Sequence, residues 1–161
     1  MAVDMFLKLD GIKGESQDKS HKDEIHIESF SWGLSQSGVS GVGGGGGAGK
    51  VNVHDISIMR FADKASPELM LACCNGKHIP GGLITVRKAG ESPLEYLKIK
   101  LTDILVSSVQ HSGSGAGDLL TESLSLNFAK FAVEYQQQGP DGKAQGGPVT
   151  MGWDVKANVK A

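Results

Sequence analysis

The sequence of 161 residues predicts a mainly β fold: a barrel flanked by one short α-helix. Apolar and polar residues alternate with a period of two along most of the chain, which is typical of half-buried strands. In several segments the alternation changes phase, as it does at a β-bulge. These segments are also long, about 12 to 17 residues where a strand usually has 5 or 6. Long strands that change faces at bulges favour a closed or nearly closed barrel.

The N-terminal half contains three expected strands. The first is residues 3–9, where the apolar face is made by Val3, Met5, Leu7 and Leu9. Residues 25–34 and 51–58 each change phase once. The switches separate Ile25 and Ile27 from Phe30, Trp32 and Leu34, and Val51 and Val53 from Ile56 and Ile58.

Three more strands are expected in the C-terminal half. In residues 94–109 the apolar face comprises Leu97, Ile99, Leu101, Leu105 and Val109. Residues 119–136 change phase between Phe128 and Phe131, and residues 149–159 alternate without a break. The Gly, Pro, Ser, Asp and Gln content assigns loops to 10–22, 38–49, 111–118 and 137–148.

One helix is expected at residues 67–75. Ser66 is placed to cap its N-terminus, with Pro67 at the first helical position and Glu68 in the first turn. Gly76 is placed to cap the C-terminus. The buried face would comprise Leu69, Met70, Ala72 and Cys73, with the Cys73–Cys74 pair acting as small, reduced core filling.

Length and charge define the class of protein. The chain is expected to form one domain, residues 1–161. The net charge of −2 and the single adjacent basic pair, Arg87–Lys88, argue against nucleic acid as a partner. No apolar run approaches the roughly 20 residues of a membrane span, and no basic region precedes an apolar segment at the start. We therefore expect synthesis in the cytoplasm, no membrane insertion and no cleaved signal peptide.

Glycine is concentrated in one block rather than spread along the chain. It occupies eight positions in an uncharged stretch: Gly38, Gly41, Gly43, Gly44, Gly45, Gly46, Gly47 and Gly49. With Lys50 the block satisfies the letters of a nucleotide-binding P-loop, but Val51 stands where Mg²⁺ needs a hydroxyl, and a β-type segment follows instead of a helix. A flexible arm that docks against protein is the preferred interpretation.

No other pattern indicates catalysis. Glu24, His26 and Glu28 could share a strand face, but an exposed polar face is the preferred interpretation of that group. The histidines form no metal-binding spacing, and no serine lies in a nucleophile-elbow motif. We expect no enzymatic activity, metal or cofactor.

The sequence resembles the Hcp (haemolysin-coregulated protein) family of bacterial type VI secretion systems along essentially its whole length. The matching segments, in order, are AVDMFLKLDGIKGES at 2–16, SWGLSQSG at 31–38, GGGGGAGKVNVHDIS at 43–57, SPELMLACCNGKH at 66–78, ITVRKAG at 84–90, LTESLSLNFAKFAVEYQ at 120–136 and GGPVTMGWDVKANV at 146–159.

The resemblance implies a two-sheet β-barrel with one flanking helix, related to phage tail-tube folds. Six copies would form a ring, and rings would stack into the inner tube of a contractile injection machine. A VgrG-type spike would cap this tube and a sheath would surround it. Small effector proteins would be carried and protected in the ring pore, and the tube would be secreted without a cleaved signal peptide.

Two sets of residues can be placed in this scheme. If Phe30, Trp32 and Leu34 face the core, the opposite small and neutral face would line the pore or contact cargo: Ser29, Ser31, Gly33 and Ser35. An ordinary solvent-exposed face is the alternative. The block from Gly38 to Gly49, with Lys50, would be an inter-subunit loop. Other functions left open are a monomeric soluble β-barrel that binds a ligand and a P-loop-like nucleotide binder.

Overall fold

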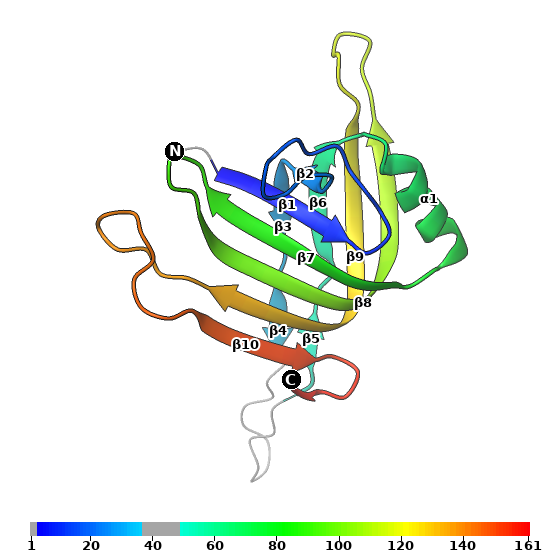
Figure 1. Ribbon diagram of the computed structural model, residues 1–161. Helices are drawn as coiled ribbons and strands as arrows, with labels where there is room; N and C mark the ends of the chain where they lie inside the picture. Colours follow the sequence, from blue (N-terminus) through cyan, green and yellow to red (C-terminus); the bar gives the residue numbers. More distant parts are fainter. Residues whose placement is uncertain (1–2, 37–48) are drawn as a thin grey trace.

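The computed structural model describes residues 3–36 and 49–161, and it confirms a mainly β fold with one helix (Figure 1). The helix is α1 (Ser66–Asn75). The strands are β1 (Val3–Leu9), β2 (Ile25–Ile27), β3 (Ser29–Ser31), β4 (Leu34–Gln36), β5 (Val51–Val53), β6 (Ile56–Phe61), β7 (Ile79–Lys88), β8 (Leu94–Ser112), β9 (Thr121–Tyr135), β10 (Val149–Asp154) and β11 (Val159–Lys160).

All the strand pairs are antiparallel, and the main sheet branches at β9. Its order is β11-β10-β9-β8-β7-β1-β2, and β9 also pairs with β6, which pairs with β3. The remaining pair, β4 and β5, forms a separate two-stranded ladder. Within the described residues, β2 pairs with β1, and β3 pairs with β6. No single strand pairs with both β1 and β6 there. The paired strands therefore do not close into a complete barrel.

The strand β9 changes neighbours where the sequence predicted a change of phase. Its first half, Thr121–Leu126, pairs with β6, and its second half, Lys130–Tyr135, pairs with β10. Phe128 lies between these two halves and Phe131 lies in the second half, and both side chains are buried. The predicted phase switch is thus confirmed, and Figure 1 shows β8 and β9 running together through the bend.

A matching bend in β8 was missed. Asp103 has a φ of 57°, in the left-handed region, and after it the buried residues are Ile104 and Val106. The prediction that Leu105 continues the core face of Leu101 is therefore wrong. A bulge between Val106 and Ser108 then restores the phase, so Val109 packs against the core. Two phase changes four residues apart resemble uninterrupted alternation in the sequence.

The strand β7 was not predicted, although it joins β1 to β8 in the sheet. Ile84 and Val86 are buried on one face, and Thr85 and Arg87 are buried on the other. Apolar and polar residues alternate over residues 84–87 only, a run too short to identify a strand, and the burial of Thr85 and Arg87 is not what a polar phase predicts. Its start, Pro80-Gly81-Gly82, also has the composition of a turn.

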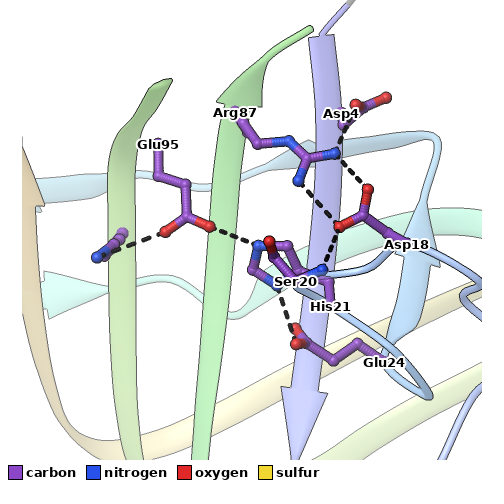
Figure 2. A network of polar contacts seen from close by, with 8 residues as sticks. Asp4, Asp18, Ser20, His21, Glu24, Arg87 and Glu95 are labelled. Carbon is purple, nitrogen blue, oxygen red and sulfur yellow. Dashed lines mark hydrogen bonds and ion pairs between the residues drawn. The ribbon is translucent and has the colours of Figure 1, made fainter. Parts of the chain in front are cut away.

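The segment 10–24 covers that second face of the sheet through a polar network (Figure 2). Arg87 donates to Asp18 at 2.7 and 2.9 Å and to Asp4 at 3.0 Å. The nitrogens of the His21 ring lie 2.9 Å from Glu24 and 2.6 Å from Glu95. The guanidinium of Arg87 holds the pKa of Asp18 down at about 2. These contacts attach a segment without regular strands to β1, β7 and β8.

Phe6 supplies the apolar part of the same contact. Its ring stacks on His21 at 4.4 Å between centroids, and Arg87 lies 5.1 Å above the ring. Phe6 is buried although it lies on the opposite face of β1 from Leu7 and Leu9. The alternation predicted for residues 3–9 therefore describes only one of two covered faces.

The helix agrees with its predicted bounds but differs in detail. Gly76 ends it in the left-handed conformation at φ 66°, as expected. Ser66 does not cap the N-terminus, because its hydroxyl accepts from the amide of Asp63 at 3.1 Å and from Arg60 at 3.5 Å. Met70 is 45% exposed and so does not belong to the buried face. Cys73 packs partly against the core while Cys74 is exposed, so only one thiol fills the core.

The C-terminal alternation is also only partly a strand. The strand β10 ends at Asp154, a turn containing Asn158 at φ 57° follows, and β11 folds back along β10. Val149 is 73% exposed, and Met151 and Val159 are exposed as well. These three residues therefore form an uncovered apolar surface near the edge of the sheet, whereas Trp153 and Val155 pack partly against the core.

Candidate binding face

Four paired strands, β3, β6, β9 and β8, build one surface from uncharged residues, most of which are serines. The ladder aligns Ser31 with Ser57, Ser125 and Ser108 in one row. A second row aligns Ser29 with Met59, Ser123 and Gln110. We call these eight residues the serine face. Together with the backbone beneath them they line a hollow of about 320 Å³.

Strand alternation and one bulge produce the serine face. Phe30, Ile58 and Leu124 point to the interior, so their odd-numbered neighbours point to the other side of the sheet. On β8 the facing residues are even-numbered, because the bulge at Ser107 shifts the register by one. Without this extra residue, Ser108 and Gln110 would not lie opposite Ser125 and Ser123.

The serine face carries no ionisable group and six of its eight residues are serines. Serine hydroxyls are short and both donate and accept hydrogen bonds, so the surface is largely polar, and only Met59 and Gln110 carry long side chains. A surface of this kind offers weak and replaceable contacts along a broad area. It is suited to transient contact with a protein surface and lacks the converging groups of a catalytic site.

One corner of the serine face is tied to a carboxylate. Asp55 accepts from the Ser107 hydroxyl at 2.6 Å and from the Asn127 amide at 2.9 Å. The Ser107 oxygen lies 2.7 Å from that of Ser125, which in turn lies 2.6 Å from that of Ser108. Three hydroxyls from β8 and β9 thus form a continuous chain that ends at Asp55.

Only half of the predicted pore residues lie in the serine face. Ser29 and Ser31 do, whereas Gly33 and Ser35 lie beyond β3, where the chain turns away to form the ladder with β5. There the carbonyl oxygen of Gly33 accepts a hydrogen bond from the backbone amide of His54 at 3.1 Å. The hydroxyl oxygen of Ser35 lies 3.2 Å from Nε2 of the His54 ring. The two pairs of residues therefore belong to different surfaces.

Most of the serine face was missed from the sequence: Ser57, Met59, Ser108, Gln110, Ser123 and Ser125. Part of the signal was present, since Ser123, Ser125 and Asn127 occupy the polar phase between Leu124, Leu126 and Phe128. This polar phase indicates an uncharged strand face, but it does not show which other strands extend that face. Pairing across four strands is not visible in a single sequence.

Most of the predicted inter-subunit loop, Gly38 to Gly47, lies outside the described residues. Gly49 borders a hollow of about 360 Å³ with Leu34, Val53 and Trp153, and Lys50 is exposed. The strand β5 follows directly after Lys50. The helix that a P-loop places after its lysine is therefore replaced by a strand, which disfavours the nucleotide-binding alternative.

Glu24, His26 and Glu28, considered above as possible metal ligands, have different partners in the structure. Glu24 contacts His21, while His26 lies 3.4 Å from Glu28. In the described parts of the chain, no group of three or more His, Cys, Asp or Glu side chains is arranged to hold a metal ion. Over those same residues, no helix has the length and apolarity to cross a membrane.

Comparison with known proteins gives consistent matches over the full chain. Residues 6–135 match the family model described as "Type VI secretion system effector, Hcp". Protein hcp1 of Pseudomonas aeruginosa is 55% identical over 162 residues, covering 100% of both chains. The crystal structure of Hcp1 from Salmonella typhimurium is 40% identical with a TM-score of 0.80, again covering 100% of both chains. A structure described as a type six secretion system protein has a TM-score of 0.93 at 30% identity and covers 99% of this chain and 100% of its own.

Proposed function

The chain belongs to the Hcp family of type VI secretion proteins, and from this premise we propose that it is a structural subunit of the secreted inner tube. Six copies form a ring, and rings stack into the tube. The subunit acts by assembly and by contact with cargo, not by catalysis. The polar groups of its serine face are six hydroxyls and one carboxamide spread over four strands, in keeping with such a role.

The serine face is the main support for this proposal, in which it forms the wall of the ring pore. A pore wall must contact many passing or resting proteins without holding one permanently. Charged side chains would attract some surfaces and repel others by several kcal/mol per buried like-charge contact, as an order of magnitude. The eight uncharged residues avoid both effects. Ser29 and Ser31 belong to this wall, and small effector proteins are the cargo that rests against it.

Exposed apolar residues support self-assembly. Val149, Met151 and Val159 are exposed at one edge of the sheet, and Leu34 is 47% exposed on the neighbouring ladder. The edge strands β2 and β11 also leave one side of their backbone unpaired within the main sheet. Uncovered apolar side chains and free strand edges are typical of surfaces that are covered in an assembly.

The remaining contacts follow from a tube. A VgrG-type spike caps the first ring, the contractile sheath surrounds the stack, and the segment from Gly38 to Lys50 reaches the next ring. In the assembled subunit β2 and β3, joined through Glu28, complete a two-sheet barrel related to phage tail tubes. The protein is made in the cytoplasm and leaves through its own secretion machine without a cleaved signal peptide.

Particle shape and mass test the proposal directly. Negative-stain images of the purified protein should show annular particles, and light scattering should give a mass of six times 16.9 kDa. A mass of one subunit with no annular particles would refute the ring and favour a monomeric protein that binds a ligand. Loss of annular particles on dilution, with recovery on concentration, would support reversible self-assembly.

A further inference from the structure

The hydroxyl chain at the corner of the serine face has only one consistent direction. A serine hydroxyl carries one proton and accepts up to two hydrogen bonds, whereas a carboxylate only accepts. Ser107 donates its single proton to Asp55 at 2.6 Å. Ser107 therefore has no proton left for Ser125, and Ser125 must be the donor in the contact of 2.7 Å between them.

The same count determines the next contact. Ser125 has used its proton toward Ser107, so Ser108 must donate across the 2.6 Å that separates Ser108 from Ser125. All three hydroxyl protons then run toward Asp55. The lone pairs that remain belong to oxygens at the surface, and Ser107 and Ser108 are both exposed. The three hydroxyls of this corner therefore offer acceptors and direct their protons away from a ligand, and only the second N–H of Asn127 remains as a donor.

The negative charge of Asp55 favours the same kind of partner, one that donates hydrogen bonds. Asp55 is half-buried, and its partners among the described residues are the uncharged groups of Ser107 and Asn127, with no ion pair to a cation. Two donors satisfy one lone pair on each carboxylate oxygen, but they do not neutralise the charge. A hydrogen bond from a charged donor is roughly twice as strong as one between neutral groups.

We propose that Asp55 orients the Ser107–Ser125–Ser108 chain so that the serine face selects protein segments rich in hydrogen-bond donors. The chemistry that fits is the guanidinium of Arg or the ammonium of Lys, which donate and cannot accept. Surfaces rich in Asp and Glu, which only accept, meet acceptors here and are disfavoured. This inference rests on the proposed function, because it names the chemistry of the cargo that the pore wall prefers.

Two peptides of equal length, one with three Arg and one with three Glu in a Gly-Ser background, test the preference. Their binding to the assembled protein is measured by fluorescence anisotropy at about 0.15 M salt, where exposed charges are screened beyond about 8 Å. We expect the Arg peptide to bind the wild-type protein about tenfold more tightly or better. Equal binding, tighter binding of the Glu peptide, or binding of neither would overturn the inference.

Matched variants separate the oriented chain from simple charge attraction. S107A keeps the Asp55 carboxylate but frees Ser125 to donate outward, so the preference should fall to about threefold or less. D55N should reduce it as well, and S92A, at an exposed loop position outside the serine face, should leave it unchanged. If D55N removes the preference and S107A retains it in full, charge alone explains binding and the oriented chain is wrong. Ring formation is measured in the same samples, so absence of rings refutes the proposed function independently of the peptide result.

Discussion

Arg60 and Glu122 form an ion pair of 2.6 Å inside the protein, with side chains only 1% and 0% exposed. They face each other directly across β6 and β9, at positions where strand alternation expects apolar core residues. Asp63 and Ser66 contact the guanidinium, and His111 lies 2.7 Å from the second Glu122 oxygen. Burial would raise the pKa of Glu122, but the hydrogen bonds from Ser66, His111 and Arg60 outweigh it and lower this pKa. The pair joins the start of α1 to the sheet.

Removing one member of this pair should destabilise the fold strongly. E122A leaves the Arg60 charge buried without its main partner, which typically costs about 3–5 kcal/mol. Urea denaturation followed by circular dichroism measures the free energy of unfolding. E91A, at an exposed loop position, serves as the control and should change it by less than about 0.5 kcal/mol. The double variant R60M/E122L should recover most of the loss, because apolar residues of similar volume can replace a buried pair. A loss below about 1 kcal/mol in E122A would contradict this account.

Asp18 should make stability depend on pH in the acid range. Arg87 lowers its folded-state pKa to about 2, below the ordinary value of 3.8 for an aspartate. Its contribution is therefore present in full above about pH 5, begins to fall near the unfolded-state pKa of 3.8, and is lost as the pH falls to about 2. The difference in unfolding free energy between wild type and D18N should be constant above pH 5 and shrink between pH 4 and 2. In an R87M background this pH dependence should disappear, and its persistence there would exclude Arg87 as the cause.

Gly14 should not tolerate a side chain. A Cβ at this position would lie 2.6 Å from the carbonyl oxygen of Glu24 and 2.8 Å from the Cα of Ile25, so backbone must move. We expect G14A to lower the free energy of unfolding by about 1–3 kcal/mol and to speed proteolysis within residues 10–24. Gly147, where a Cβ would meet nothing within 4 Å, gives the control G147A. Equal stability of the two variants would show that the segment adapts without cost.

A bulky residue at Ser31 should affect cargo and leave assembly intact. Ser31 is exposed on the serine face, so S31W fills part of the hollow without entering the core. We expect annular particles to form while effector proteins that co-purify with the wild type decrease at least tenfold. S114W, at an exposed position in the loop between β8 and β9, should retain them. Unchanged co-purification with S31W would remove this part of the serine face from the pore wall.

Shortening the glycine run should affect stacking and spare the single ring. Deletion of residues 43–47 shortens the proposed inter-ring segment by five residues without touching β4 or β5. Light scattering should still give the mass of six subunits, and secretion of the protein into the medium should fall. A deletion variant that is secreted normally would contradict the role of this segment. Loss of the ring itself would place the segment within a ring instead.

The sequence was sufficient to predict a strand and its buried face where one face of the strand is apolar and the other is polar. Ile25, Ile27, Leu124 and Leu126 are buried as the alternation predicted, and the phase switch after Phe128 lies where β9 changes neighbours. It was not sufficient where both faces are covered, as in β7. Burial there depends on residues 10–24, which contact the strand from more than 60 positions away, through Asp18 and Arg87.

The candidate site was harder to predict than the fold. Ser29 and Ser31 were found because they alternate with Phe30 and Trp32, but Ser108 reaches the same surface only through the bulge at Ser107. Arg60 and Glu122 lie on the core phase of their strands and read as breaks in an apolar pattern. Their pairing spans 62 residues, so local periodicity carries no sign of it.

The continuity of β8 and β9 through their bend has a mechanical consequence. The same two backbones carry the serine face at one end and the ladder with β7 and β10 at the other. A load applied to either end therefore passes along covalent bonds and a shared hydrogen-bond ladder, not across a soft interface between separate sheets. In the proposed tube, each subunit would therefore deform as one piece, and the stack would transmit an axial push along continuous strands.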